Sequence, residues 1–403
     1  MGLFAGEVLD FEVCDPEVIS TATDAVINEK YVRGEIRIVT EQARYPLSTI
    51  AEIVESSSYK LSPEYQRRHR WSQLQQSKLI ESLIMNVPIP PIFLYEYDYS
   101  KYEVMDGLQR LTAIHDFYRD KYVLTGMSEW SELNGRNYTN LPEKIKEGID
   151  RRYLSSVILL KETAKSDTDA LRLKQMVFER INSGGEPLMP QETRNAIFDG
   201  PLNRLCIKLS KEKSLCRLWG IPEPEQGEID GDLPSQNRIQ NESFRRMEDV
   251  ELVLRFFAYR QKHILHKGTS LKEYLDSYLQ AGNSFEPTTL DSLEILFVKT
   301  INLTEDIFGE KAFWLYRQRQ SSDSWRWRES PTTTIYDSLM YALSNHIDRA
   351  DDLRPHASKF QEIIESFYME NYEIFAGRNV NPSMLRQRDD KFEEFIVSIL
   401  DQS

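Results

Sequence analysis

The first half of the chain contains several segments with the apolar pattern of β-strands. Residues 35–43 (GEIRIVTEQ) alternate apolar and polar side chains, as a half-buried strand does. Residues 91–97 and 101–106 are two apolar stretches separated by a short turn at residues 98–100. They predict a β-hairpin, and residues 153–162 predict a further strand.

Helical periodicity separates these strands. Residues 45–56 predict a short helix with Ser48 or Thr49 as its N-cap, whereas Pro63 favours an extended backbone over residues 59–72. Further helices are predicted over residues 73–86, 111–120, 168–182 and 190–200. From residue 201 onward nearly every pattern is helical, including residues 245–260, and a polar Pro/Gly-rich break at residues 221–238 predicts a loop.

These patterns predict an α+β fold with two domains. A mixed domain covers residues 1–200, and an all-helical domain covers residues 201–403. A length of 403 residues agrees with two domains, because a single core of this size is uncommon.

Composition narrows the class of protein. The chain is 40% hydrophobic and 28% charged, and no apolar run approaches the roughly 20 residues that cross a bilayer. Its three cysteines, Cys14, Cys206 and Cys216, lack metal-site or disulfide spacing, so we expect a cytoplasmic protein. The net charge of −14 argues against a generally basic DNA-coating protein but permits a local basic groove.

The stretch VMDGLQRLTAI (104–114) places an unusual set of polar residues where a strand should lead into a helix. The free N–H groups and the dipole of a helix start favour anions, and Gly107 would let a phosphate approach the backbone. Arg110 can form a bidentate contact with phosphate oxygens, while Asp106 can hold a divalent cation and Gln109 can orient a water. The alternative is an Asp106 N-cap followed by an exposed Gln–Arg pair.

Two further segments carry candidate ligand residues. In YQRRHRW (65–71), Arg67, Arg68 and Arg70 lie beside Tyr65 and Trp71, which suits an anion site flanked by stacking rings. The alternative is a solvated basic loop anchored by two aromatic residues. In FERINSGGEPLMPQETRNA (178–196), a loop able to wrap a ligand contains Asn182, Ser183, Gly184 and Gly185, and the alternative is an ordinary helix stop.

Together and in this order, the motifs resemble the GmrSD restriction-enzyme N-terminal domain family. The segments that carry the resemblance are YQRRHRW (65–71), PIPPI (88–92), DGLQRLT (106–112) and FERINSGGEPLMPQETR (178–194). The resemblance covers about residues 45–200. It implies a ParB/sulfiredoxin-like core that binds and hydrolyses nucleoside triphosphates.

The same resemblance assigns roles to individual residues. It makes Asp106, Gly107, Gln109 and Arg110 the hydrolytic turn, Arg67 a phosphate partner and Asn182 a residue that closes the pocket. Leu108 departs from the family pattern, which has a glutamine at this position. If that glutamine positions water or base, its replacement by Leu108 would weaken hydrolysis, while nucleotide binding would remain.

The second half offers no nuclease of the His-Asn-His type. His263 and His266 have helical spacing but lack further metal ligands of sensible spacing, and Asn345-His346 lacks the expected surroundings. A basic and aromatic patch at residues 316–330 contains Arg326 and Arg328, which can contact nucleic acid. The alternative is an edge strand with buried tryptophans and solvated arginines.

The sequence thus favours an NTPase of a bacterial restriction or anti-phage system that couples nucleotide turnover to DNA recognition. Mg²⁺ bound by Asp106 is the expected cofactor, and Arg68, Arg70, Arg326 and Arg328 are the expected DNA contacts. The alternative is a nucleotide-binding regulatory subunit with little hydrolysis that acts with a separate nuclease. A third hypothesis, DNA nicking by the arginine-rich site itself, is the least favoured.

Overall fold

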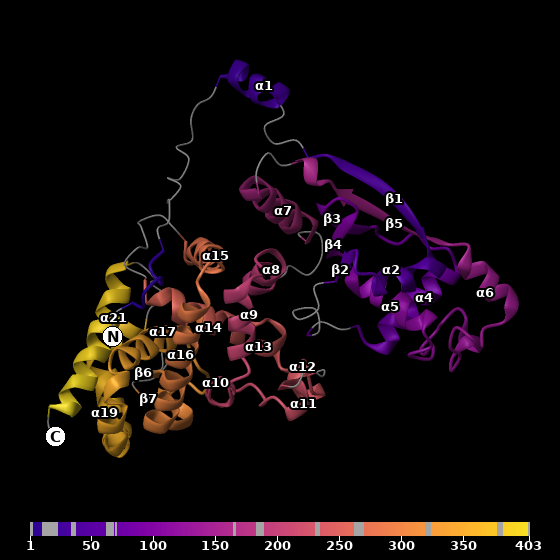
Figure 1. Cartoon of the computed structure of the whole chain (residues 1–403). Coiled ribbons are helices and arrows are strands. Elements are labelled where there is room, and N and C mark those ends of the chain that lie inside the picture. The colour runs from indigo at the N-terminus through magenta and orange to yellow at the C-terminus, as the bar shows by residue number, and fades with distance from the viewer. Residues whose placement is uncertain are drawn as a thin grey trace. The chain divides into compact units, whose positions relative to one another are not determined.

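A computed structural model describes most of the 403-residue chain. The described residues are 3–9, 23–33, 38–61, 68, 71–163, 167–182, 189–229, 234–261, 270–318, 324–376 and 382–401. The chain divides into two compact units (Figure 1). The sheet unit is Ile19–Leu188, and the helical unit combines Met1–Val18 with Met189–Ser403.

The sheet unit contains five strands and the helices that connect them. Its strands are β1 (Thr40–Pro46), β2 (Tyr59–Lys60), β3 (Ile92–Asp98), β4 (Lys101–Asp106) and β5 (Tyr153–Leu159). Its α-helices are α1 (Asp24–Arg33), α2 (Ile50–Glu55), α4 (Gln73–Ile84), α5 (Leu108–Tyr118), α6 (Glu143–Asp150) and α7 (Asp167–Asn182). Short 3₁₀ turns occur at Leu47–Thr49, Ser131–Leu133 and Lys161–Thr163.

The strands form one mixed sheet in the order β1-β5-β3-β4-β2. The pairs β1–β5 and β3–β4 are antiparallel, and the pairs β3–β5 and β2–β4 are parallel. The predicted hairpin is therefore confirmed as β3–β4, with Asp98 opposite Lys101 at its turn. The strand predicted over residues 153–162 is confirmed as β5, which ends at Leu159.

Apolar side chains of the sheet and its helices form the core of this unit. One face of the sheet packs with α2, α4 and α5 around buried residues that include Ile80, Leu94, Val104 and Phe117. Helix α7 contacts β4, where Lys174 Nζ lies 2.7 Å from Glu103 Oε2, and both side chains are largely buried. A buried ion pair of this kind fixes the position of α7, because either charge alone would be costly to bury.

Local sequence explains the helix that leads into the hairpin. Helix α4 starts where predicted, because Ser72 and Gln75 form a reciprocal capping box. The prediction of a helix from residue 45 is wrong at its start, since Tyr45 and Pro46 still belong to β1 and pair with Leu154 and Tyr153. Pairing with β5 outweighs the local helical pattern there.

The helical unit is built from many helices, several of them short. The helices of its first part are α8 (Pro190–Ile197), α9 (Pro201–Leu209), α10 (Lys213–Trp219), α11 (Gln226–Ile229), α12 (Gln236–Gln240), α13 (Glu242–Arg245), α14 (Glu248–Tyr259) and α15 (Leu271–Gly282). Those of its second part are α16 (Pro287–Phe308), α17 (Thr333–Asn345), α18 (Ala350–Leu353), α19 (Ala357–Glu370), α20 (Tyr372–Phe375) and α21 (Pro382–Leu400). The 3₁₀ turns are Gly309–Lys311, Ile347–Arg349 and Arg354–His356.

The N-terminal residues belong to this helical unit. Glu7 is fully buried, and its carboxylate accepts hydrogen bonds from Arg260 Nε at 2.7 Å and Nη2 at 3.0 Å. Gln261 Nε2 donates to the Glu7 carbonyl at 2.6 Å, and Thr289 Oγ1 donates to the Ala5 carbonyl at 3.0 Å. The sheet unit is therefore inserted between two segments of the helical unit.

Two expectations about this second half need correction. It is not all-helical, because β6 (Tyr316–Gln318) and β7 (Trp325–Trp327) form an antiparallel hairpin. The segment predicted as a loop contains the short helices α11 and α12, although residues 230–233 lie outside the described residues. The overall class is mixed α+β, with a five-stranded sheet followed by helices. No helix within the described ranges is long and apolar enough to cross a membrane.

Candidate functional site

The polar turn predicted from the sequence lies at the junction of β4 and α5. Asp106 is the last residue of β4, and α5 starts at Leu108, three residues earlier than predicted. The β3–β4 register shifts between Phe93 and Leu94, which leaves Met105 as an extra residue beside Asp106. Bulges of this kind often redirect a neighbouring side chain and are enriched next to functional sites.

Gly107 is required at this junction for two structural reasons. It adopts the left-handed conformation with φ at 93°, which L-residues with a side chain disfavour. A Cβ atom here would lie 2.4 Å from Ile92 Cγ2. The backbone therefore packs against the side chain of Ile92 on β3, and the glycine is explained without a ligand.

Arg110 is held at the start of α5 by two contacts. Its Nη2 lies 2.6 Å from Asp106 Oδ2, and its Nη1 donates to the Pro90 carbonyl at 3.0 Å. The Arg110 side chain is 11% exposed and that of Asp106 is 36% exposed. The guanidinium is thus already oriented, while the carboxylate keeps an accessible surface.

Gln109 connects the turn to the upstream motif. The backbone N–H of Trp71, the last residue of the YQRRHRW segment, donates to Gln109 Oε1 at 3.2 Å. Pro90 and Ile92 come from the PIPPI segment, so three of the four motifs meet at this turn. These motifs are far apart in sequence, and the β3–β4 hairpin brings them together.

The far end of α5 is held by a separate ion cluster that the sequence did not indicate. Glu55 on α2 accepts hydrogen bonds from Arg119 Nε at 2.8 Å and Nη2 at 2.7 Å, and its Oε1 lies 3.2 Å from His115 Nε2. The hydrogen bond from Arg119 is the main reason that the pKa of Glu55 falls to about 2, and His115 adds to it. Both ends of α5 are therefore anchored by charged contacts.

A metal at the turn would depend on Asp106. In the described part of the chain, no three His, Cys, Asp or Glu side chains cluster as a metal site. Mg²⁺ commonly takes one or two carboxylates and completes its shell with water and substrate phosphates. Asp106 fits that pattern, because one oxygen holds Arg110 and the carboxylate has a second oxygen to offer.

The other residues predicted for this site are placed less completely. Asn182 is the last residue of α7. Arg68 is only 5% exposed, and this burial favours a place inside the sheet unit over contact with nucleic acid. The remaining predicted residues lie outside the described residues, and these are Tyr65, Arg67, Arg70, Gly184 and Gly185.

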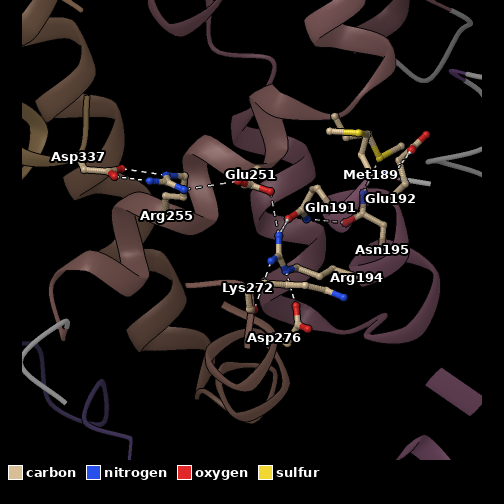
Figure 2. Close-up of polar contacts among 11 residues, drawn as sticks. Met189, Gln191, Glu192, Arg194, Asn195, Glu251, Arg255, Lys272, Asp276 and Asp337 are labelled. Atoms are coloured by element: carbon tan, nitrogen blue, oxygen red, sulfur yellow. Dashed lines mark hydrogen bonds and ion pairs between the residues drawn. The ribbon is translucent and has the colours of Figure 1, made fainter. Parts of the chain in front are cut away.

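The last motif continues into the helical unit and serves a different purpose there. Arg194 on α8 is 1% exposed, and it donates to Asp276 on α15 at 2.6 Å and to Glu251 on α14 at 3.0 Å (Figure 2). Glu251 also lies 3.5 Å from Arg255, which pairs with Asp337 on α17. This buried ionic network links four helices, and sequence analysis did not single it out.

The candidates in the second half are also located. Arg326 and Arg328 lie on or just after β7 and are exposed. His346 caps the C-terminus of α17, and its Nε2 lies 2.6 Å from Glu393 Oε1. His263 and His266 lie outside the described residues. Cys206 and Cys216 are buried free thiols, and burial raises the pKa of Cys216.

The sheet unit is thus a small α+β module whose hairpin leads into a polar strand-to-helix turn. Residues 50–198 match the sequence model of the family described as GmrSD restriction endonuclease, N-terminal domain. This match confirms the family resemblance that the motifs predicted for this part of the chain. Neither the curated proteins nor the solved structures include a match to the chain.

Proposed function

We propose that the sheet unit binds a nucleoside triphosphate at the β4–α5 turn, as part of a restriction or anti-phage defence system. The family of residues 50–198 supports the link to restriction. The observation that carries the nucleotide assignment is the convergence of Asp106, Gln109 and Arg110 at the start of α5, next to Trp71 and Pro90. We further propose a ParB/sulfiredoxin-like fold for this unit, supported by its mixed sheet and this strand-to-helix turn.

The chemistry of the turn suits phosphate oxygens. The first N–H groups of α5 lack helical partners and carry the positive end of the helix dipole. Arg110 would move part of its hydrogen bonding from Asp106 to the phosphate, and it is held close enough to do so by Pro90. Mg²⁺, when bound between Asp106 and the phosphates, would neutralise charge on the β- and γ-phosphates.

Hydrolysis requires a group that accepts a proton from, or orients, the attacking water. Gln109 is the candidate, with Asp106 as a further acceptor. The nucleotide would also contact Tyr65, Arg67, Asn182, Gly184 and Gly185. The proposal also includes DNA recognition through Arg70, Arg326 and Arg328. It further includes a separate nuclease as partner and a cytoplasmic location.

A second candidate function is nucleotide binding with little turnover. Gln109 Oε1, the atom that would accept from a water, already accepts the Trp71 N–H. Leu108 also stands where the family pattern has a glutamine. Both observations favour a regulatory subunit that changes state on binding and leaves cleavage to a partner.

Two assays on the full chain separate these functions. Phosphate release from each NTP with Mg²⁺ reports turnover, and calorimetry reports binding. Turnover that is lost in Asp106→Ala and retained in Asp116→Ala, a variant in the last turn of α5, supports the NTPase. Binding without turnover supports the regulatory subunit, and an Asp106→Ala variant with unchanged turnover contradicts the proposed role of the turn.

A further inference from the structure

The β6–β7 hairpin of the helical unit sorts its side chains onto two faces. Its register pairs Tyr316 with Trp327, Arg317 with Arg326, and Gln318 with Trp325. Because side chains alternate along a strand, the aromatic residues share one face and Arg317 and Arg326 share the other. Burial follows this alternation, with half-buried aromatic residues and exposed arginines.

The aromatic face packs against α19 and α20, and Figure 1 shows β6 and β7 near α19. The ring of Trp327 contacts that of Tyr368 with centroids 6.0 Å apart, and Trp327 Nε1 donates to Glu365 at 2.8 Å. Trp325 packs against Tyr372 with centroids 5.1 Å apart. The indole rings are therefore engaged within the unit, and these contacts hold β6 and β7 against it.

The outer face carries three exposed arginines, Arg317, Arg326 and Arg328. Arg317 and Arg326 lie directly opposite each other, an arrangement that destabilises a hairpin, and Arg328, the residue after β7, is also exposed. Among the described residues none of the three has an ion-pair partner. Other exposed arginines of the unit do, such as Arg204 with Asp199 and Arg349 with Asp352.

This contrast is informative in a chain with a net charge of −14. Carboxylates are plentiful, yet in the part of the chain that the structure describes none of them forms an ion pair with these arginines. An anionic partner would remove the repulsion between Arg317 and Arg326. Cross-strand Cβ atoms lie about 5 Å apart, so two guanidinium groups can reach one phosphate or neighbouring phosphates of a strand.

We propose that Arg317, Arg326 and Arg328 form a contact surface for the phosphate backbone of double-stranded DNA. This inference rests on the DNA recognition included in the proposed function and locates part of it. Because the indole rings face α19 and α20, base stacking does not contribute, and the contact is independent of sequence. The surface would hold DNA to the helical unit, while the β4–α5 turn handles nucleotide.

Fluorescence anisotropy of the full chain with a labelled duplex tests this surface. The double variant Arg317→Gln/Arg326→Gln removes the cross-strand pair, and Arg204→Gln/Arg349→Gln removes equal charge from positions with carboxylate partners. We expect the first variant to bind about 10-fold or more weakly, with a salt slope reduced by about 2, since each phosphate contact contributes about 0.9. The control should bind within about 2-fold of wild type.

A charge-preserving variant guards against a folding artefact. Arg317→Lys/Arg326→Lys should keep most of the affinity and the salt slope if the contact is electrostatic. A Gln variant that binds duplex as tightly as its control overturns the surface but leaves DNA recognition intact. A wild-type chain that binds no duplex, or prefers single strands, overturns this surface. Nucleotide affinity of the same preparations reports separately on the turn.

Discussion

Arg110 Nη2 lies 2.6 Å from Asp106 Oδ2. Asp106 is one residue before the left-handed Gly107, and Arg110 is three residues after it. The two charged groups lie close together because only Gly107 separates the end of β4 from the start of α5. The geometry of this pair places a cation and a carboxylate beside the unpaired N–H groups of a helix start. This relationship is the basis of the nucleotide site proposed above.

The turn should depend on the absence of a side chain at residue 107. Gly107→Ala should lower the free energy of unfolding by more than the about 1–2 kcal/mol that a left-handed alanine costs, because its Cβ would meet Ile92 at 2.4 Å. Gly135→Ala is the matched control, since Gly135 has φ at 82° and open space around it. Urea denaturation measures both, and equal losses would show that the Ile92 contact does not matter.

The attachment of α7 to the sheet should depend on a charge balance. Lys174→Met leaves Glu103 buried without its cation and should cost about 3–5 kcal/mol, and Lys174→Met/Glu103→Leu should recover most of that loss. Lys144→Met, which breaks a pair whose lysine is 83% exposed, should cost less than about 1 kcal/mol. Chemical denaturation of these variants tests the prediction. A double variant no more stable than Lys174→Met would argue against the charge balance.

The motif residue Arg194 should be a stability residue. Arg194→Met removes the cation from two carboxylates, Glu251 and Asp276, and should cost about 3 kcal/mol or more. Arg204→Met, at a position whose side chain is 68% exposed, should change the midpoint of unfolding very little. Thermal melting compares them, and an Arg194→Met variant as stable as Arg204→Met would refute the network.

Acid should weaken the contact between α2 and α5. The pKa of Glu55 is lowered from 4.5 to about 2 by the hydrogen bond from Arg119 and then by His115. Since the folded pKa is below the unfolded one, this stabilisation is present above pH 4.5 and is lost as pH falls toward about 2. The difference in Tm between wild type and Glu55→Gln should shrink from about pH 5 to about pH 3.

The neighbouring variant Glu52→Gln provides the comparison for that pH series. Glu52 is an exposed residue of the same helix, so its substitution changes charge without removing the Arg119 hydrogen bonds. Its Tm difference from wild type should vary less with pH. A Glu55→Gln difference that stays constant across the range would contradict the assignment.

Much of the sheet unit was predictable because local sequence and tertiary structure agree. The apolar stretches 91–97 and 101–106 matched β3 and β4, and the helix predicted from residue 73 matched the start of α4. The start of α5 was misplaced, because a glycine in left-handed conformation allows the helix to begin directly after the strand. The extension of β1 to Pro46 was also not predicted, because it depends on the pairing of Pro46 with Tyr153 on β5.

The candidate site was predictable in its residue types and less so in its contacts. The order of the motifs indicated the turn. The local sequence did not predict the hydrogen bond from Trp71 to Gln109 or the one from Arg110 to the Pro90 carbonyl. Arg194 has the sequence surroundings of a surface arginine, and only packing of α8 against α14 and α15 reveals its burial. The opposition of Arg317 and Arg326 depends on strand register, which composition does not contain.

Calorimetric titration of nucleoside triphosphates with Mg²⁺ into the full chain tests the central claim most directly. Wild type should bind at least one NTP, and Arg110→Ala should lose about 10-fold or more in affinity, because a charge-assisted contact contributes about 1.5–3 kcal/mol. Arg119→Ala, at the other end of the same helix, should retain wild-type affinity. No binding by wild type, or equal affinity in Arg110→Ala, would contradict the assignment of the turn.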